Sequence, residues 1–409
     1  MATVGVMGTL DTKGDDYAWV AERLRDCGVD VLMIDVGSFS HSELADVTSD
    51  EVIAAAGADA AAVRGRRDRG EMMKVMGDGA AVIVRGLAAE GKIHGVFAMG
   101  GSGGSSVAAP AMQALPIGFP KLLVSTMASG NVKPYVGEVD TTLMYSVVDV
   151  AGINSVSAQV LGNAAAGIAG MAEAYETRQG AADEHRPVIG VTMFGVTTPA
   201  ADEARKRLTE LGYEVLVFHA TGTGGRAMEK LVESGLLTGV LDLTTTELCD
   251  ELAGGVLSAG PDRLEMAGRL GTPQVVSLGA LDMVNFGPMD TVPEKYRDRT
   301  LFVHNPTVTL MRTTPEEMGE LGRQIATKLR AATGPTALYV PLKGVSAIAV
   351  EGAPFYDAVA DQACFAALRE GLAGSAVTVI ERDMAINDPG FGSEMADALH
   401  AFITKEGKN

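Results

Sequence analysis

The sequence predicts an α/β protein of two domains, each built on an open parallel sheet, and three observations lead to this prediction. The chain has 409 residues, which is more than one ordinary hydrophobic core organises. Short apolar runs rich in β-branched residues alternate with amphipathic stretches, a pattern typical of strand–helix–strand units with right-handed crossovers. Many of the 50 glycines directly follow an apolar run, where a tight turn from strand to helix favours them.

The expected strands follow one another along both halves of the chain, with helices between many of them. In the first half we expect strands over Thr3–Met7, Val29–Ile34, Val82–Val84, Gly95–Met99 and Lys121–Val124. In the second half we expect them over Val188–Thr192, Val215–Phe218, Gly239–Leu243, Gln274–Ser277, Leu301–Val303, Ala337–Val340 and Val377–Ile380. Amphipathic helices are expected, for example, over Tyr17–Asp26 and Ala200–Leu211.

A charged segment, Glu176–Pro187, divides the chain. It contains a glycine and ends at a proline just before a new apolar strand, as a linker between domains does. We therefore expect a first domain over residues 1–178 and a second over residues 187–409.

The two halves repeat a pattern. Gly5 lies inside the first apolar strand and Gly28 precedes the next one, and Gly190 and Gly212 hold the same places in the second half at nearly the same spacing. This repetition indicates two related, Rossmann-like units, although two generic strand–helix–strand units would also share such residues. Ligands of open parallel sheets bind beyond the carboxyl ends of the strands. We therefore expect two such edges that face a central cleft.

The composition excludes several classes of partner. The 33 basic and 52 acidic residues give a net charge of −19, which repels nucleic acids and anionic membranes. The start of the chain lacks the basic segment of a signal peptide, and the most apolar stretch, Ala151–Ala174, carries asparagine, serine and glutamine, so it is not expected to span a membrane. Cys27, Cys249 and Cys364 lie far apart without a CxxC pair, which indicates a reducing, cytoplasmic location.

The segment Gly8–Gly14 joins the first strand to the first helix and has the composition of a phosphate-binding loop. Thr9 and Thr12 offer hydroxyls, Lys13 offers a cation, and Asp11 is a candidate ligand for a magnesium ion. The lysine precedes the last glycine of this segment, so the pattern is not a Walker loop. The other interpretation is an ordinary capped turn with a solvated lysine.

A second glycine-rich segment follows the strand that ends at Met99 and leads into an alanine-rich helix. Four glycines in five positions strip it of side chains, so that successive amides converge on a phosphate or carboxylate at the positive end of the helix. The other interpretation is tight packing between strand and helix. The residues assigned to this site are Gly100, Gly101, Ser102, Gly103, Gly104 and Ser105.

A third segment follows the next strand and supplies Thr126, Ser129 and Gly130 as candidate oxyanion contacts. All three segments follow strands of one sheet, so they are expected to meet at one edge. Their composition favours a nucleotide site, because the GxGxxG pattern of a dinucleotide fold does not occur. Asp35 ends the second strand, where it would contact a ribose, cap a helix or lie in solvent.

A corresponding segment of the second half precedes an amphipathic helix and is expected to bind a second anion, such as a substrate carboxylate or phosphate. Its glycines leave the backbone amides exposed, and its arginine supplies a positive charge for the anion. The other interpretation is a helix start with a surface arginine. The residues assigned to substrate binding are Gly222, Thr223, Gly224, Gly225 and Arg226, with Lys343 from a later strand end.

Polar residues at strand ends of the second half are the candidates for catalysis. His219 and His304 are candidates for general acid–base roles, because a neutral imidazole carries protons near pH 7, and Asp242 and Glu247 are the acidic candidates. The alternatives are structural, hydrogen-bonded histidines, or a metal site formed by these residues without an HxH or HExxH spacing. Cys249 is a candidate nucleophile, with a small buried thiol as the alternative.

Small residues recur every four positions at Gly162, Ala166 and Gly170. Such a stripe allows close helix contact at a domain or subunit seam. We expect a homo-oligomer, a dimer or higher.

With these motifs in view, the chain resembles the Tm-1-like ATP-binding domain family, a largely uncharacterised group related to a plant protein that restrains a tobamovirus. The resemblance extends over nearly the whole length. It rests on the segments Gly8–Gly14, Gly100–Gly104, Ser125–Gly130, His219–Met228, Leu241–Leu248 and His304–Pro306. It implies an ATP-binding first domain of Rossmann-like architecture and a second α/β domain of obscure role. It does not carry over antiviral activity.

These observations lead to three hypotheses about function. The first is an enzyme that binds ATP and Mg²⁺ and acts on a small anionic metabolite in the interdomain cleft, by phosphoryl transfer or carboxylate activation. The second is an enzyme that cleaves C–C or C–N bonds with the second domain. The third is a nucleotide-gated interaction protein without turnover. The polar residues at the strand ends of the second half favour an enzyme.

Overall fold

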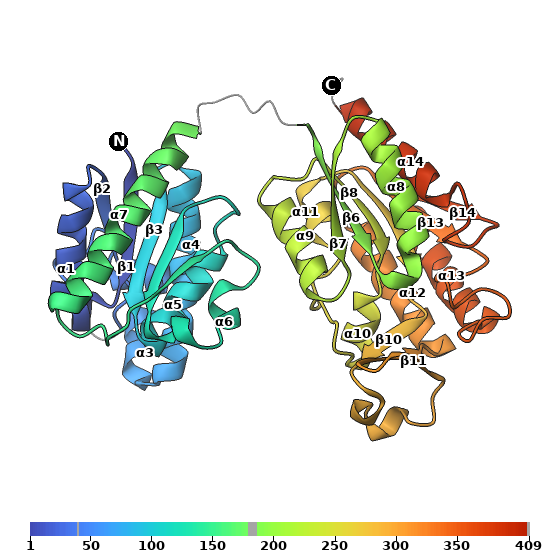
Figure 1. Cartoon of the computed structure of the whole chain (residues 1–409), viewed down its shortest axis with the longest axis horizontal. Helices are drawn as coiled ribbons and strands as arrows, with labels where there is room; N and C mark the ends of the chain where they lie inside the picture. The colour runs from blue at the N-terminus through green and yellow to red at the C-terminus, as the bar shows by residue number, and fades with distance from the viewer. Residues whose placement is uncertain (39–40, 179–185, 407–409) are drawn as a thin grey trace. The chain divides into compact units, whose positions relative to one another are not determined.

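The computed structural model describes residues 1–38, 41–178 and 186–406. The chain folds into two compact units, Met1–Asp183 and Glu184–Asn409, which we call unit 1 and unit 2; Figure 1 labels their elements. Within the expected linker Glu176–Pro187, residues 179–185 lie outside the described residues. Among the described helices, none combines the length and the apolar character that crossing a membrane requires.

Unit 1 is built on a five-stranded parallel sheet in the order β2-β1-β3-β4-β5. Its strands are β1 (Thr3–Gly8), β2 (Asp30–Asp35), β3 (Gly95–Gly100), β4 (Lys121–Ser125) and β5 (Thr142–Tyr145). Its helices are α1 (Leu10–Asp26), α2 (Ser49–Ala55), α3 (Ala60–Arg66), α4 (Arg69–Ala89), α5 (Ser102–Gln113), the 3₁₀ turn η1 (Thr126–Ser129), α6 (Lys133–Val136) and α7 (Ser155–Arg178).

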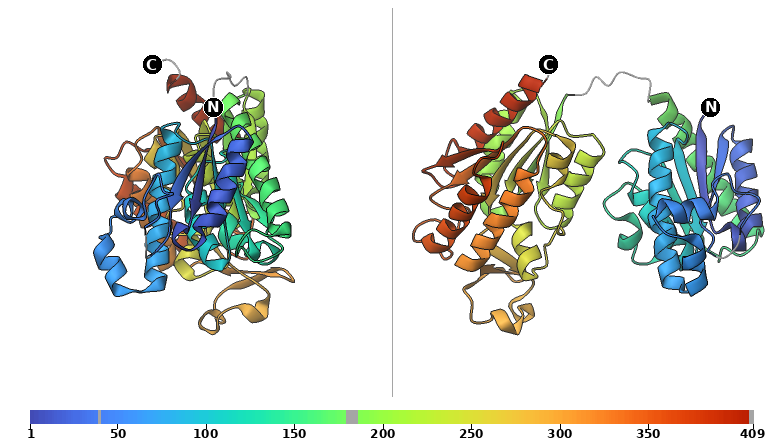
Figure 2. Two further views of the ribbon diagram at one scale, coloured as in Figure 1. Left: turned by 90° about the vertical axis from the view of Figure 1, so that its left-hand side faces the viewer. Right: turned by 180° about the vertical axis from the view of Figure 1, so that it is seen from behind.

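The sheet of unit 1 is covered on both faces. Helices α1 and α7 lie on one face and α4 and α5 on the other, as Figures 1 and 2 show. Alternate residues of each strand enter alternate cores: Val4 and Val6 pack with α1 and α7, whereas Met7 packs with α4 and α5. Burial on both faces explains why the strands read as continuous apolar runs.

Unit 2 is built on a six-stranded parallel sheet in the order β14-β13-β9-β8-β6-β7. Its strands are β6 (Val188–Met193), β7 (Glu214–His219), β8 (Gly239–Thr244), β9 (Gln274–Gly279), β13 (Thr336–Pro341) and β14 (Thr378–Arg382). Its helices are η2 (Gly195–Thr197), α8 (Thr198–Glu210), α9 (Thr223–Glu233), α10 (Glu247–Ala253), α11 (Met266–Leu270), α12 (Pro315–Arg330), α13 (Ala358–Leu372) and α14 (Phe391–Glu406).

A second, antiparallel sheet belongs to unit 2. It pairs β10 (Met283–Phe286), β12 (Val308–Arg312) and β11 (Leu301–Asn305), with the 3₁₀ turns η3 (Met289–Thr291) and η4 (Glu294–Tyr296) between β10 and β11. On the main sheet, α8 and α14 cover one face, and α9, α11, α12 and α13 contribute to the cores of the other.

The two main sheets share one strand order. In each unit the first strand of the unit lies between the second and the third, and Gly5 pairs with Leu32 as Gly190 pairs with Leu216. The repeated sequence pattern therefore corresponds to a repeated topology. The prediction of two α/β units with parallel sheets is confirmed.

Some local predictions were wrong. Val82–Val84 lies inside helix α4, because Met72, Met76, Ala80 and Val84 are buried at the four-residue spacing of a helix face. The expected strand Leu301–Val303 exists but belongs to the antiparallel sheet and not to a parallel one. The sequence analysis missed β5, β10 and β12, which are only four or five residues long.

Candidate functional site

Unit 1 has a pocket of about 410 Å³ at the carboxyl edge of its sheet. It is lined by the segments that follow β1, β2 and β3, by the first turns of α4 and by Asp149. The strand order explains the position of this pocket. The chain leaves β1 toward α1 on one face and leaves β3 toward α5 on the other, so a crevice opens between the two loops.

The N-terminus of α5 faces this pocket without a side-chain cap. The helix begins at Ser102 after its N-cap residue Gly101, which has no side chain that could cap the first turn. Gly103 and Gly104 belong to this first turn and line the pocket with Gly101 and Ser102. The first amides of a helix lack partners inside the helix and carry its positive dipole end. An anion in this pocket would therefore meet bare N–H groups.

Packing does not require all of these glycines. A Cβ on Gly101 would lie 3.7 Å from Thr126 Oγ1, and a Cβ on Gly103 would lie 3.4 Å from Arg69 Nη2, both ordinary contacts. Gly100 differs, because its Cβ would lie 3.2 Å from Gly104 Cα. Gly8 also serves packing: its missing side chain leaves room for the Tyr17 ring, 2.2 Å from a Cβ there.

Two cations belong to the pocket. Lys13 lies at a kink in α1, where its φ of −132° departs from helical values, and its Nζ donates to the Val150 carbonyl. Arg69 is the first residue of α4 and is exposed. Within the described ranges it forms no hydrogen bond or ion pair. Its guanidinium lies beside the first turn of α5, so its charge is available to a ligand there.

Two carboxylates lie next to each other at the start of α1. Asp35 is buried after β2, and its Oδ1 accepts hydrogen bonds from Gly37 N at 2.8 Å and Leu10 N at 3.3 Å. Its Oδ2 is buried and has no hydrogen-bond partner among the residues that the structure describes. A Cβ on Gly37 would lie 2.6 Å from Asp11 Cγ and 2.9 Å from Asp35 Oδ1. Burial raises the pKa of Asp35, and the charge of Asp11 adds to this shift against the two amide hydrogen bonds.

The structure brings together part of the expected nucleotide site. Thr9, Asp11, Thr12 and Lys13 line the same pocket as Gly101, Ser102, Gly103 and Gly104. Thr126 lies beside Gly101, but Ser129 and Gly130 are not among the residues that line this pocket. Ser105 is buried, and its hydroxyl bonds to Ser125 Oγ at 2.6 Å, so it holds β4 and α5 together.

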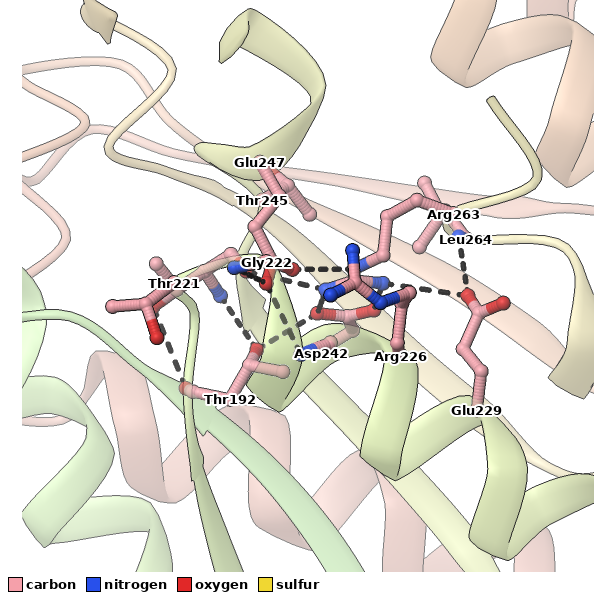
Figure 3. A network of polar contacts seen from close by, with 12 residues as sticks. Thr192, Thr221, Gly222, Arg226, Glu229, Asp242, Thr245, Glu247, Arg263 and Leu264 are labelled. Atoms are coloured by element: carbon pink, nitrogen blue, oxygen red, sulfur yellow. Dashed lines mark hydrogen bonds and ion pairs between the residues drawn. The ribbon is translucent and has the colours of Figure 1, made fainter. Parts of the chain in front are cut away.

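The glycine-rich turn of unit 2, which follows β7, the second strand of that unit, already holds a carboxylate, shown in Figure 3. Oε1 of Glu247 accepts hydrogen bonds from Gly222 N at 2.6 Å and Gly225 N at 3.1 Å. Its Oε2 accepts from Arg263 Nε at 2.6 Å. Glu247 is fully buried. An internal side chain therefore occupies the place where the sequence analysis expected a substrate anion.

Arg263 joins this carboxylate to a second one. Its Nη2 donates to Asp242 Oδ1 at 2.7 Å, and Thr192 Oγ1 donates to the same oxygen at 2.7 Å. Burial alone would lower the pKa of the Arg263 guanidinium, but Asp242 and Glu247 raise it well above its usual value. Glu229 lies 3.6 Å from Arg263 Nη1, and burial raises its pKa to about 7 against the attraction of the arginine. The network is thus a buried cluster in which one guanidinium pairs with two carboxylates.

The glycines of this turn serve packing. A Cβ on Gly224 would lie 1.9 Å from the His219 carbonyl, and one on Gly225 would lie 2.1 Å from Glu247 Oε2. Gly222 has a φ of +84°, and its Cβ would lie 2.6 Å from the Ser258 carbonyl. Thr223 is the first residue of α9, and Arg226 Nη1 donates to that same Ser258 carbonyl at 3.1 Å.

The other candidates of unit 2 lie apart. His219 is exposed at the end of β7, with its ring centroid 5.4 Å from that of Phe194. His304 is exposed on β11 of the antiparallel sheet. Lys343 is exposed and pairs with Asp383 at 2.9 Å. The structure therefore does not gather the two histidines around Asp242 and Glu247, which are buried with Arg263.

Arg69, Asp149 and Arg263 were missed by the sequence analysis. Arg69 belongs to the segment Arg64–Arg69, which carries four arginines in an acidic chain, and this local charge reversal is a signal that the sequence contains. Asp149 and Arg263 lie in loops without a motif, and only the fold places them.

The comparisons with known proteins fit this two-unit organisation. Models of the N-terminal and C-terminal domains of Uncharacterised protein family UPF0261 match residues 2–177 and 186–403. A UPF0261 protein from Clostridium tetani is 50% identical over 404 residues, 98% of both chains, and one from Rhizobium meliloti is 47% identical over 98% of this chain and 99% of its own length. The ToMV resistance protein Tm-1 from Solanum lycopersicum is 40% identical over 370 residues, which cover 86% of this chain and 49% of the tomato protein. The relationship to Tm-1 proteins that the motifs predicted is confirmed.

Solved structures give only distant likenesses. A UDP-N-acetylglucosamine 2-epimerase from Rickettsia bellii matches with a TM-score of 0.24 and 9% identity, over 67% of this chain and 78% of its own. The corresponding epimerase from Methanocaldococcus jannaschii matches with a TM-score of 0.22 and 10% identity, over 99% of this chain and 94% of its own. These scores are too low to carry a conclusion about function.

Proposed function

The chain belongs to the UPF0261 family, and we propose that its unit 1 binds ATP with Mg²⁺ in the pocket at the carboxyl edge of the sheet. The observation that carries this proposal is the N-terminus of α5, which has no side-chain cap and lines the pocket beside the guanidinium of Arg69, a group without a hydrogen bond or ion pair in the described ranges. Bare helix amides and positioned cations are what a polyphosphate requires in a protein of net charge −19.

The pocket residues divide into three roles in this proposal. The amides of Gly101–Gly104 bind phosphate oxygens, and the charges of Arg69 and Lys13 offset those of the phosphates. The hydroxyls of Thr9 and Thr12 are further donors. Asp11 holds the magnesium ion, which neutralises phosphate charge and orients the γ-phosphate.

The contrast between the two units favours an external ligand in unit 1. In unit 2 the amides of the glycine-rich turn are bonded to Glu247, and a side chain on Gly224 or Gly225 would collide with its neighbours. In unit 1 the glycines at positions 101 and 103 have room for a Cβ and face a pocket. A glycine that packing does not demand, next to bare amides, is typical of close backbone approach to a ligand.

The proposal extends to ATP-dependent phosphoryl transfer to, or carboxylate activation of, a small anionic metabolite. Positioning and charge stabilisation supply most of the catalysis of such reactions, and the cations of this pocket are suited to both. In this proposal Asp242 and Glu247 are assigned no step, because Arg263 and backbone amides already engage them.

Calorimetry of the full chain tests the proposal. ATP with Mg²⁺ should bind with a one-to-one stoichiometry, ADP more weakly, and NADH not at all. Gly103→Asp, which puts a carboxylate among the phosphate-binding amides, should abolish ATP binding, whereas Gly86→Asp on the exposed side of α4 should leave it unchanged. Equal ATP affinity of both variants would refute the site. Phosphate release measured with pools of small carboxylates and phosphorylated metabolites then tests turnover, and its absence with every pool would leave nucleotide binding as the function.

A further inference from the structure

We infer that Asp11 and Asp35 together form a divalent-cation site beside the pocket of unit 1, with the buried Oδ2 of Asp35 as a ligand oxygen. This inference deepens the proposed function and rests on it for the role of the ion. Its test needs no nucleotide.

The first observation is the state of the Asp35 carboxylate. Its side chain is fully buried, and Oδ1 accepts both hydrogen bonds, from Gly37 N at 2.8 Å and from Leu10 N at 3.3 Å. These two amides fix the orientation of the carboxylate, and among the described residues the buried Oδ2 has no hydrogen-bond partner. A buried polar oxygen without a partner carries an uncompensated cost of desolvation. A group that binds Oδ2 would remove this cost.

The second observation is the proximity of Asp11. Asp11 Oδ1 and Asp35 Oδ1 lie 2.7 and 2.9 Å from the same point, the place of a Cβ on Gly37. Two carboxylates this close repel each other unless a proton or a cation lies between them. Gly37 leaves open the space that a larger residue would fill with its side chain, and such a side chain would collide with both carboxylates.

The chemistry of these ligands selects the class of ion. Both side chains offer hard oxygen ligands, which Mg²⁺, Mn²⁺ and Ca²⁺ prefer, whereas Zn²⁺ and Cu²⁺ favour imidazole and thiolate. In the part of the chain that the structure describes, no group of three or more His, Cys, Asp or Glu side chains could hold a metal. A two-carboxylate site leaves the remaining positions to water, to hydroxyls and to ligand phosphates. Magnesium is commonly bound in this way in phosphoryl-transfer sites.

The position of this site would serve the proposed ligand. Asp11 lines the pocket, and so do Val36 and Ser38, which directly follow Asp35. An ion bound by Asp11 and Asp35 would therefore lie at the pocket that Gly101–Gly104 also line. The other possible partners of Asp35 Oδ2 are a proton or a ribose hydroxyl, and neither requires a metal.

Titration of the nucleotide-free, full-length chain with Mn²⁺, followed by electron paramagnetic resonance of the free ion, tests the inference. The wild type should bind Mn²⁺ at one site, and Mg²⁺ should compete. Asp35→Asn keeps an oxygen for Gly37 N and Leu10 N but removes the anionic ligand, so it should fold normally and lose at least about tenfold in Mn²⁺ affinity. Asp15→Asn, at an exposed position of α1, is the matched control and should bind Mn²⁺ as the wild type does. Thermal unfolding without metal checks that both variants are folded.

The results separate this inference from the proposed function. Equal Mn²⁺ affinity of the wild type and Asp35→Asn would overturn the cation site. The site would also be overturned if the wild type bound no Mn²⁺ and its affinity for ATP were the same with and without EDTA. That second result would leave the nucleotide proposal intact. Mn²⁺ binding that depends on Asp35 in a chain without affinity for ATP would support the cation site and refute the nucleotide proposal.

Discussion

The carboxylate of Glu247 closes the N-terminus of α9, where its Oε1 accepts a 2.6 Å hydrogen bond from Gly222 N. Gly222 N and Gly225 N, at the start of α9, are therefore bonded within the protein, and Figure 3 shows Gly222 and Glu247 at this contact. In unit 1, the N-cap residue of α5 is Gly101, which has no side chain to cap the helix. The glycine-rich turn after the third strand of unit 1 thus differs from the one after the second strand of unit 2. In unit 2 the turn packs around the buried Glu247, whereas in unit 1 the turn lines the pocket.

Replacing Arg263 by methionine should strongly destabilise unit 2. Arg263 is buried and pairs with both Asp242 and Glu247, so its loss leaves two buried carboxylates without their shared counter-charge. Removing one partner of a buried ion pair costs about 3–5 kcal/mol. Chemical denaturation of the full chain measures this loss. Arg269→Met, which breaks an exposed pair with Glu265, should cost no more than about 1 kcal/mol, and a similar effect of the two substitutions would contradict the role given to the network.

The stability of unit 2 should fall as the pH rises from about 5 to about 8. Burial raises the pKa of Glu229 from 4.5 to about 7, so the folded state binds this proton more tightly than the unfolded state does. Its contribution is greatest below the unfolded pKa and is lost as the pH rises through the folded one. Glu229→Gln mimics the protonated side chain, so at pH 8 it should be more stable than the wild type by about 1–3 kcal/mol.

Thermal unfolding at pH 5 and pH 8 measures the effect of Glu229→Gln. At pH 5 the variant and the wild type should unfold at similar temperatures, because Glu229 is then protonated in the folded state. Asp250 has a pKa that burial raises to about 7 as well, so the variant should keep part of the pH dependence. A variant that is less stable than the wild type at pH 8 would show that Glu229 is needed as an anion beside Arg263.

The sequence predicted the architecture well for a physical reason. Parallel strands buried on both faces read as apolar runs, and their glycine-rich ends mark the turns, so most strands of both main sheets were placed within about two residues. Val82–Val84 was misplaced because three consecutive apolar residues do not distinguish a strand from a buried helix face. The short strands β5 and β12 carry too little pattern to be recognised.

The candidate site was harder to predict than the fold. The loops after β1 and β3 were expected to meet because parallel strands share an edge, and they do line one pocket. The sequence could not show that Glu247 would fill the turn at Gly222, because this contact depends on how α10 lies against α9. The sequence does not distinguish a turn glycine that makes room for a side chain, as Gly8 does for Tyr17, from one that makes room for a ligand.

Alanine substitutions of glycine should separate these two uses. Gly225→Ala places a methyl group 2.1 Å from Glu247 Oε2 and 2.6 Å from Arg263 Nε, so it should destabilise unit 2 by at least about 1–3 kcal/mol. Gly103→Ala meets only the ends of two side chains, Arg69 Nη2 at 3.4 Å and Met73 Cε at 3.9 Å, and alanine is favoured over glycine in a helix. It should leave folding unharmed and weaken ATP binding by about tenfold or more, which is about 1.4 kcal/mol. Thermal unfolding and calorimetry measure the two effects, and a loss of stability in Gly103→Ala would show that this glycine serves packing.

The final prediction concerns Arg69. Its guanidinium has no internal partner in the described ranges, so Arg69→Met should not lower the unfolding temperature. A charge-assisted hydrogen bond contributes about 1.5–3 kcal/mol, so the loss of the contact to phosphate should weaken ATP binding by roughly 10- to 150-fold.

Arg67→Met is the matched control, because Arg67 is exposed two residues earlier in the same basic segment and does not line the pocket. Calorimetry at low and high salt separates direct contact from diffuse attraction, since screening removes the latter. At high salt Arg69→Met should remain weak while Arg67→Met matches the wild type. If both variants lost the same affinity at low salt and recovered it together at high salt, Arg69 would act only as part of a basic surface and not as a phosphate ligand.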